Sequence, residues 1–420
     1  MNRSVSEVGT HKIVAPDLAS PSFKANPYPF YSRLRAEAPL WRTMLPGKRA
    51  AWLVTRYEDV AAVLKDKEGR YAKDKLNAMD PGQRKRTPWV PGFLKPLERN
   101  MLDLDDPDHA RLRSLVGKAF TPRLVERLRG RVESLSEGLL DAMERKGARE
   151  GRAELVGDYA LPLPATVIAE LLGVPAKDQV KFHRWSSRLV SVSSGRDMAR
   201  ALPAALSFVR YLRRLVERRR VDPGEDLITA LIREEEEGDN LSKDEILAMA
   251  FLLLVAGHET TVNLISGGTL ALLQYPEQAE VLRRNPSLAK PAIEELLRYT
   301  SPVEVATERY AREVVEIAGA TIPGGELVLA VLGSANHDEN HFEDPDTLEL
   351  ARDPNRHLAF GRGGVHHCLG APLARMEGEI AVKALQRRFP HGRLAVAPET
   401  LRWRRGLFLR GLERLPLVLH

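Results

Sequence analysis

The longest apolar stretch of the chain follows a clear helix-start signal. Ser242 and Glu245 form a capping box directly before the apolar residues 246–257. The pattern predicts a helix that ends near Gln274, where Tyr275 and a proline stop it. This helix would have about 30 residues and a length of roughly 45–50 Å. Because residues 246–255 are apolar on almost every side, we expect the helix to be buried.

The remaining pattern is mostly helical. Amphipathic repeats separated by glycine and proline predict successive helices over residues 122–237. Residues 73–99 are rich in proline, glycine and charge, and predict a long loop. Shorter patterns predict a helix opening at 26–35, a strand at 51–56, a helix at 57–64 and a hairpin at 321–328.

Composition narrows the class of protein. The 420 residues are 43% hydrophobic, which suffices for a large core, although length alone suggests two or three domains. A single cysteine excludes internal disulfides and fits a reducing compartment. The first 20 residues lack a signal-peptide pattern, and the apolar run is too short to span a bilayer, so we expect a cytoplasmic protein without a membrane anchor.

The net charge of +6 first suggests nucleic acid as a partner. The basic residues are, however, interleaved with apolar and acidic ones, as on solvated helix faces. We therefore predict no nucleic acid partner. An acidic protein partner stays open.

The only cysteine lies in a glycine-rich loop. Gly361, Gly363 and Gly364 precede Cys368, and a helix begins near Pro372. Free N–H groups at a helix start favour a thiolate, which suits an axial iron ligand. The alternative is a small buried hydrophobic residue. Zinc is disfavoured because His366, His367 and Cys368 are adjacent, and a dinucleotide loop lacks its third glycine.

Polar residues interrupt the middle of the long helix. Ala256, Gly257 and His258 are followed by Glu259 and Thr260. An acid and a hydroxyl in a buried helix are locally unfavourable, and such exceptions often mark function. The glycine lets a ligand approach the backbone, and the threonine is able to bond a backbone carbonyl. The sequence also resembles a zinc protease motif, but its second histidine is replaced by Val262.

Three further pairs stand at helical spacing. His109 and Arg113 share one helix face, as do Glu295 and Arg298. Taken alone, both are ordinary surface pairs. His337 and its neighbour four residues on, His341, are predicted to lie on the surface.

These motifs together resemble the cytochrome P-450 superfamily of soluble bacterial type. Its haem loop reads Phe-Gly-x-Gly-x-His-x-Cys-Leu-Gly, and Gly364, His366, Cys368 and Gly370 match it when counted back from the cysteine. One extra residue separates Phe360 from Gly364, so either a bulge restores the phenylalanine contact or its packing differs. The other motifs follow in family order.

The resemblance implies a single domain over residues 1–420, mainly α with small β-sheets, in the triangular prism of the family. Haem b would lie between the long central helix and the cysteine-loop helix, and residues 1–20 would be a flexible segment. The implied haem contacts are the axial Cys368 with His109, Arg113, Arg309, Phe360, Gly364, His366 and Gly370.

Further roles follow from the same resemblance. Glu259 and Thr260 would deliver protons to dioxygen, and Ala256 and Gly257 would complete this catalytic motif. Glu295, Arg298 and Arg352 would brace the haem loop. The substrate pocket would include residues 73–99 and 182–206. Its implied single positions are Val255, Val303, Val305, Ala306, Leu407 and Phe408.

The implied activity is a monooxygenase that inserts one oxygen atom of dioxygen into a C–H or C=C bond of an apolar small molecule. Terpenoids, macrolides, steroids and fatty-acid-like compounds all fit. Electrons would come from a separate ferredoxin or flavodoxin-type donor, docked through Arg111, Lys118 and Arg362. Alternatives are a peroxygenase driven by hydrogen peroxide and a haem sensor without turnover; Glu259 and Thr260 disfavour both.

Overall fold

A computed structural model describes residues 13–45, 49–79, 100–190, 195–236 and 241–420. Two parts of the predicted pocket, residues 80–99 and 191–194, lie outside the described residues, as do residues 1–12 of the predicted flexible segment. Within that segment, Leu18 is buried and packs in the same hydrophobic cluster as Phe23 and Tyr31. Ala19 is buried as well, whereas Val14 is 81% exposed.

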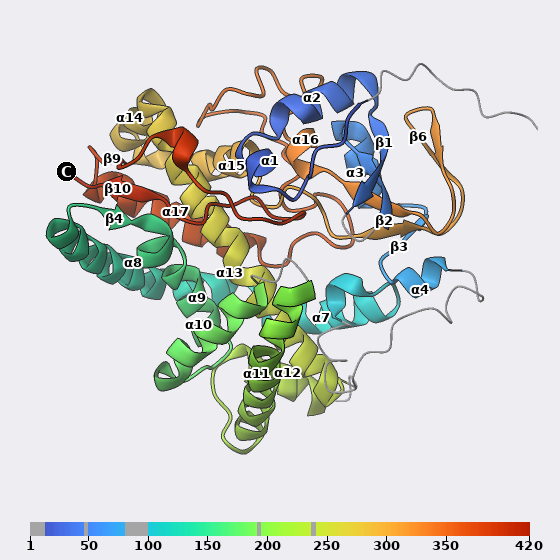
Figure 1. The fold of residues 1–420 in the computed structure, drawn as a ribbon. Helices are drawn as coiled ribbons and strands as arrows, with labels where there is room; N and C mark the ends of the chain where they lie inside the picture. The colour runs from blue at the N-terminus through green and yellow to red at the C-terminus, as the bar shows by residue number, and fades with distance from the viewer. Residues whose placement is uncertain (1–12, 46–48, 80–99, 191–194, 237–240) are drawn as a thin grey trace, which may run out of the picture.

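The predicted long helix is present as α13 (Lys243–Gln274). Ser242 caps it, and the capping box with Glu245 is complete. The helix crosses the molecule between its β-rich part and its helical part (Figure 1). By length and composition α13 resembles a membrane span, yet most of its apolar window is buried inside the protein, as in the core helix of a soluble protein.

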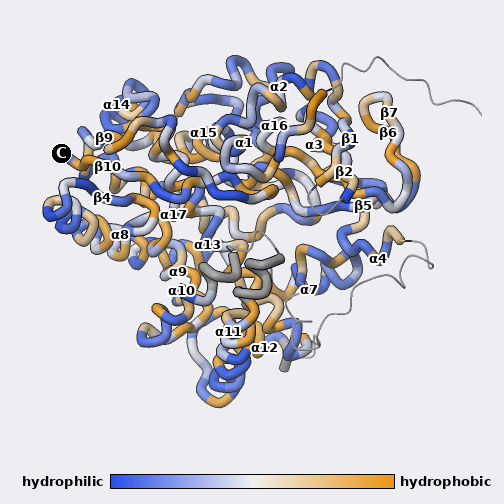
Figure 2. The backbone as a smooth tube through the Cα atoms, viewed as in Figure 1, coloured by the Kyte–Doolittle hydropathy of each residue, from blue (hydrophilic) through white to orange (hydrophobic). Residues whose placement is uncertain are grey.

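The larger helices surround α13. It contacts α9, α11, α15 and α17, and α17 packs on α8. In Figure 2 the outer helix α8 alternates between hydrophilic and hydrophobic segments, as expected for an amphipathic helix. The bounds of these helices are α8 Pro122–Glu150, α9 Pro162–Leu171, α10 Ala176–Val190, α11 Gly195–Val221, α12 Leu227–Glu236, α14 Pro276–Arg284, α15 Ala289–Thr300 and α17 Ala371–Arg388.

Short helices and strands form the second part of the molecule. The helices are α1 Pro21–Ala25, α2 Tyr28–Glu37, α3 Tyr57–Lys65, α4 Lys75–Ala78, α7 Asp108–Ala119 and α16 Leu332–Ala335. A five-stranded sheet has the order β1-β2-β8-β5-β3, in which β2 and β8 are parallel. Its strands are β1 Leu40–Leu45, β2 Arg49–Val54, β8 Leu327–Ala330, β5 Arg309–Ala311 and β3 Tyr71–Ala72.

The predicted hairpin at 321–328 is wrong. β7 (Ala320–Ile322) pairs back with β6 (Val315–Ile317), whereas β8 joins the five-stranded sheet. The turn lies at Ala318 and Gly319, which both have positive φ angles. A third small sheet joins β4 (Ala153–Glu154), β10 (Pro416–Val418) and β9 (Arg393–Leu394).

The surface placement predicted for His337 is also wrong. Its side chain is 1% exposed and stacks on Tyr28, with ring centroids 3.8 Å apart. Nδ1 lies 2.8 Å from an oxygen of Asp346, and Nε2 lies 3.0 Å from the carbonyl of Tyr299. Burial is favourable here because both ring nitrogens have partners. His341 is half-buried and stacks on Tyr57.

Candidate functional site

The cysteine loop ends at the start of α17, as the sequence predicts. Gly370 is the N-cap of this helix, with Cys368 two residues earlier. The Cys368 side chain is accessible to solvent, yet the protein packed around the loop raises the pKa of its thiol. The N–H groups of Gly370 and Ala371 oppose that rise. The loop therefore supplies donors that stabilise a thiolate.

Glycines accommodate the extra residue of the loop. Gly361 and Gly363 both have positive φ, at 68° and 85°. A side chain at Gly364 would lie 2.0 Å from the carbonyl oxygen of Leu64, so only glycine permits this close approach. The chain then returns to Phe360, whose carbonyl accepts a hydrogen bond from the Cys368 amide at 2.9 Å. The backbone bulge thus keeps Phe360 beside the cysteine.

Charged side chains cover the ring of Phe360. The guanidinium of Arg375 lies 4.5 Å from the ring centroid and donates two hydrogen bonds to Glu294 of α15, at 2.6 and 2.8 Å. Glu294 also contacts His357 Nε2 at 3.0 Å. These partners outweigh burial and lower the pKa of Glu294 to about 2. The cluster ties α15 and α17 to the start of the cysteine loop.

Five cationic or titratable side chains gather on the other side of the loop: Lys73, His109, Arg113, Arg309 and His366. The His109 and His366 rings lie 4.0 Å apart, and the other members all lie close enough to act electrostatically on His366. Burial lowers the pKa of Lys73 to about 7 and that of Arg309 to about 10. Such crowding of positive groups is costly unless an anion joins them.

The residues fit the two carboxylates of a haem. His109 Nε2 and His366 Nδ1 are buried without a hydrogen-bond partner in the described structure. Both lie in the cationic cluster, and Cys368 follows two residues after His366. Unpartnered buried ring nitrogens beside buried cations indicate room for a ligand with acidic oxygens. The sequence analysis did not predict Lys73 as a haem contact. Its membership of the cluster follows from its burial in the folded protein, and no motif spacing indicates it.

The middle of α13 keeps the predicted polar contacts. Thr260 Oγ1 donates a hydrogen bond to the carbonyl of Ala256 at 3.0 Å, and Ala256 itself is exposed. The helix is nevertheless continuous through this point. A side chain at Gly257 would lie 3.3 Å from Ile168 of α9, so close helix packing gives a reason for this glycine besides ligand approach.

Glu259 has a partner from a distant part of the chain. The NH1 group of Arg404 donates to Glu259 Oε1 at 2.7 Å, and the carboxylate is 8% exposed. The second oxygen, Oε2, is buried without a hydrogen-bond partner in the described structure. Arg404 therefore holds the carboxylate through one oxygen only. No spacing pattern in the sequence indicates Arg404.

Because the resemblance implies that Glu259 delivers protons to dioxygen, we expect the Arg404→Leu variant to produce less product per dioxygen consumed. The buried carboxylate loses a charge-assisted hydrogen bond worth about 1.5–3 kcal/mol and so its fixed orientation. Acid–base groups contribute about 10²–10⁴-fold to such rates, so we expect at least about a tenfold loss of product. The measurement is the ratio of product formed to hydrogen peroxide released.

The matched control is Arg405→Leu, which removes an exposed ion pair with Asp17. Unchanged coupling in Arg404→Leu would contradict the role.

The described pocket residues divide into two groups. Val255, Val303, Leu407 and Phe408 are half-buried and present apolar surface. Val305 is 2% exposed, packed with Tyr31 and other core residues, and thus differs from the predicted pocket contact. Ala306 is likewise buried, at 8% exposed.

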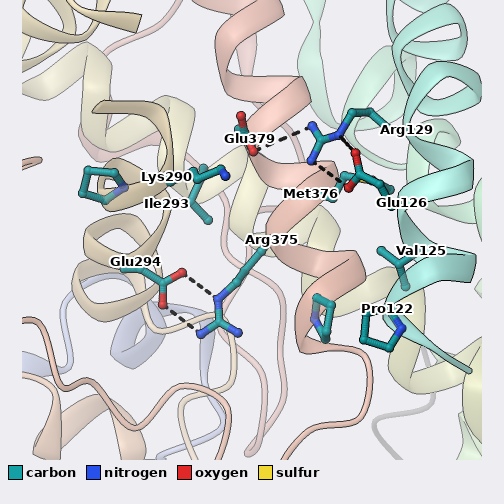
Figure 3. A pocket seen from close by; sticks show the side chains of 12 residues that line it. Pro122, Val125, Glu126, Arg129, Lys290, Ile293, Glu294, Arg375, Met376 and Glu379 are labelled. Carbon is teal, nitrogen blue, oxygen red and sulfur yellow. Dashed lines mark hydrogen bonds and ion pairs between the residues drawn. The ribbon is translucent and has the colours of Figure 1, made fainter. Parts of the chain in front are cut away.

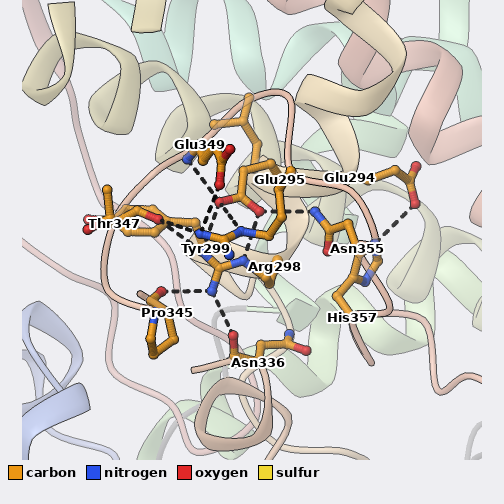
Figure 4. Close-up of polar contacts among 12 residues, drawn as sticks. Glu294, Glu295, Arg298, Tyr299, Asn336, Pro345, Thr347, Glu349, Asn355 and His357 are labelled. Atoms are coloured by element: carbon orange, nitrogen blue, oxygen red, sulfur yellow. Dashed lines mark hydrogen bonds and ion pairs between the residues drawn. The ribbon is translucent and has the colours of Figure 1, made fainter. Parts of the chain in front are cut away.

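The predicted bracing residues form one buried network (Figure 4). Arg298 donates two hydrogen bonds of 2.8 Å to Glu295, and both side chains are fully buried. Arg352 Nε lies 3.3 Å from the same carboxylate, and Asn355 Nδ2 donates to it at 3.0 Å. Arg298 also donates to three backbone carbonyls, those of Asn336, Pro345 and Thr347. The network fixes the segment that leads into the cysteine loop.

Comparisons with known proteins agree with this geometry. The family model described as Cytochrome P450 matches residues 168–400. The polyketide biosynthesis cytochrome P450 PksS of Bacillus subtilis is 46% identical over 94% of this chain and 96% of its own. The cytochrome P450 monooxygenase PikC of Streptomyces venezuelae is 46% identical over 94% of this chain and 91% of its own. The solved structure of myxobacterial CYP267B1 with myristic acid has a TM-score of 0.88 at 42% identity, covering 97% and 100% of the two chains.

The chain therefore belongs to the cytochrome P450 family. It is a haem-thiolate oxidoreductase of the monooxygenase type, and its mainly α fold with small sheets is the family fold. The sequence prediction of family, fold class, cofactor and enzyme class is confirmed.

Proposed function

We propose that this enzyme oxygenates an apolar polyketide-type, macrolide or fatty acyl compound with electrons from a separate ferredoxin or flavodoxin-type protein. It would act in the cytoplasm as a single domain. The observation that carries the proposal is the presence of three parts in one chain: the Cys368 loop, the buried cations around His366, and the polar residues Glu259 and Thr260 within α13.

Haem with an axial thiolate supplies dioxygen binding, O–O cleavage and oxygen insertion. Cys368 would be the ligand, because the chain has no other cysteine. His109, Arg113, Arg309 and Lys73 would bind the haem carboxylates. Glu259 Oε2 would hold the proton to be delivered, and the Thr260 hydroxyl would accept a hydrogen bond while it donates to Ala256.

The substrate class rests on the pocket residues and the relatives. The half-buried single positions assigned to the pocket are apolar: Val255, Val303, Leu407 and Phe408. An apolar lining gains free energy by removing an apolar ligand from water. One relative of 42% identity is a 6-deoxyerythronolide B hydroxylase, and the solved CYP267B1 holds myristic acid. These two relatives support polyketide and fatty acyl substrates. A vitamin D(3) 25-hydroxylase is also 42% identical, and the solved CYP109E1 holds testosterone, so a steroid belongs in the test panel.

A visible titration of the purified ferric protein tests the substrate class. The panel is 6-deoxyerythronolide B, myristic acid, a monoterpene and testosterone, followed at the Soret band. We expect a shift toward high spin with one of the first two compounds, because a bound substrate displaces water from the iron. A shift with only the terpene or the steroid would contradict the class. Product formation with hydrogen peroxide alone that exceeds product formation with ferredoxin and reductase would favour a peroxygenase.

The predicted docking cations differ in their surroundings. Arg111 is paired with Glu245 of α13, and Lys118 is paired with Glu234 at 2.9 Å. Arg362, in the cysteine loop, is exposed. A cation already paired within the chain offers less attraction to a partner. We therefore assign the donor contact first to Arg362.

A groove of about 410 Å³ beside this loop extends the docking face (Figure 3). It lies among α8, α15 and α17, and Pro122, Ile293 and Met376 form part of its apolar lining. Arg129 at its rim pairs with Glu126, whereas Lys290 is exposed. An apolar floor with a charged rim has the composition of a transient protein interface. The groove supports docking on the cysteine side of the molecule.

We expect the double variant Arg362→Glu with Lys290→Glu to raise the apparent Kd of a plant-type ferredoxin about tenfold at low salt, because like charges then meet an acidic donor. The difference should shrink as salt increases. Stopped-flow reduction of the ferric haem measures it. The control Lys177→Glu reverses an exposed charge on α10, which contacts α9, α11 and α13. Equal reduction kinetics in the double variant and the control would exclude this surface.

A further inference from the structure

A buried ion pair joins helix α1 to the segments assigned to the substrate pocket. Lys24 and Glu304 are 0% and 1% exposed, and Lys24 Nζ lies 3.0 Å from Glu304 Oε2. The Tyr31 hydroxyl donates a hydrogen bond to Glu304 Oε1. Because charges removed from water need exact partners, these three side chains fix one another's positions.

The same lysine binds the second pocket segment. Lys24 Nζ donates a hydrogen bond to the carbonyl of Leu407 at 3.0 Å. In return, Arg410 Nε donates to the backbone carbonyl of Lys24 at 2.9 Å. The residue therefore holds the segment from 407 to 410 at both ends.

Backbone contacts join the two pocket segments to each other. The amides of Glu304 and Val305 both lie within hydrogen-bond distance of the Phe408 carbonyl, at 2.8 and 3.2 Å. Val303 and Leu409 form an isolated antiparallel bridge. These contacts connect the segments, and Lys24 connects the pair to the N-terminal part of the core.

Packing alone does not require a charge at this point. Apolar residues of similar volume fill a buried space without the cost of desolvation. The ion pair adds direction, because Lys24 Nζ lies 3.0 Å from Glu304 Oε2 while it donates a hydrogen bond to the Leu407 carbonyl. A fixed direction is what a pocket wall needs in order to hold one substrate orientation.

We propose that Lys24, through Glu304 and the Leu407 carbonyl, is a positioning residue that sets the separation of Val303 and Phe408 and thereby the width of the substrate pocket. The proposal rests on the proposed assignment of these two segments to the pocket. It gives α1, which is remote in sequence from every motif, a role in specificity.

Four variants of the haem-loaded full chain test the proposal. Lys24→Met keeps the side-chain length and removes the charge, whereas Lys24→Arg keeps the charge. Tyr31→Phe removes one hydroxyl, so it remains informative even where Lys24→Met fails to fold. The matched control is Arg35→Met, because Arg35 is a buried cation, 3% exposed, that pairs with Glu339 and Ser334 and makes no hydrogen bond to Glu304 or Leu407.

Two measurements are made on each variant. The first is hydrogen exchange of residues 303–306 and 406–410 relative to α13. The second is the Kd of ferric protein for imidazole and for the bulkier 4-phenylimidazole, read from the Soret shift. Imidazole touches the iron alone, whereas the larger ligand also contacts the pocket wall. The ratio of the two constants therefore reports pocket width and not general stability.

We expect Lys24→Met to speed exchange in both segments at least about tenfold and to change the Kd ratio about threefold or more. Tyr31→Phe should change both in the same direction, Lys24→Arg should restore both in part, and Arg35→Met should change neither. Faster exchange with an unchanged Kd ratio, or exchange that rises equally throughout the chain, would overturn the proposal. A wild-type protein that binds no imidazole at its haem would instead contradict the proposed function.

Discussion

Arg298→Leu is expected to destabilise the enzyme by about 3–5 kcal/mol, the cost of leaving a buried charge without its partner. Glu295 is fully buried and would lose both hydrogen bonds from Arg298, and three backbone carbonyls would lose their donor. Since globular domains have about 5–15 kcal/mol in total, most of the protein should be recovered without haem or in aggregates. Urea unfolding of the holoenzyme and haem content per chain measure the effect.

A surface ion pair within a single helix provides the control. Arg33 and Glu37 are 47% and 44% exposed, so Arg33→Leu should cost less than about 1 kcal/mol. If Arg298→Leu unfolded at the same urea concentration as Arg33→Leu, the network would not brace the haem loop. Both changes remove one arginine from an ion pair within a helix. A difference in stability between the two variants therefore reports the burial of the Arg298 pair and not the mere loss of an ion pair.

Cys368→Ser is expected to abolish oxygenation, with a loss of at least about a hundredfold. Changes in the groups that merely support a metal ligand already cost 10–100-fold, and this change removes the ligand itself. A hydroxyl is also a much weaker electron donor than a thiolate, so O–O cleavage loses its driving force. The direct measurement is the absorption spectrum of the reduced carbon monoxide complex, which should lose its thiolate signature.

A neighbouring substitution tests the loop without touching the ligand. Val365 is 55% exposed, so Val365→Ala should retain haem, spectrum and activity. A thiolate spectrum in Cys368→Ser would exclude Cys368 as the ligand. Haem content per chain is measured together with both spectra. This measurement distinguishes a variant that has lost its haem from one that keeps haem without the thiolate ligand.

Local sequence was sufficient wherever a few neighbouring residues decide the conformation. The capping box of Ser242 and Glu245 set the start of α13, and the apolar pattern set its burial. Gly361 and Gly363 adopt the left-handed backbone angles that the loop requires. Family, fold class and cofactor followed from such short motifs, since their chemistry is carried by contiguous residues.

Pairing between distant segments was not accessible to that reasoning. The strand at 320–322 turned back to β6 instead of forward to β8, and His337 became buried by Asp346 and Tyr299. Arg404 reached Glu259 across 145 positions, and Lys73 joined the cations around His366. No regular spacing of residues in the sequence indicates any of these contacts.

The sequence by itself indicated the P450 family, through the resemblance of its ordered motifs. It also predicted the helix start near Pro372, after Cys368, and the burial of the long helix, because hydrophobic periodicity, capping and glycine angles act over a few residues. Only the tertiary structure decided which charges meet. Lys24, Glu304 and the Leu407 carbonyl are 383 positions apart at their extremes, yet they share one desolvated site. Electrostatic pairing depends on distance in space and on exclusion of water, and both are properties of the packed chain.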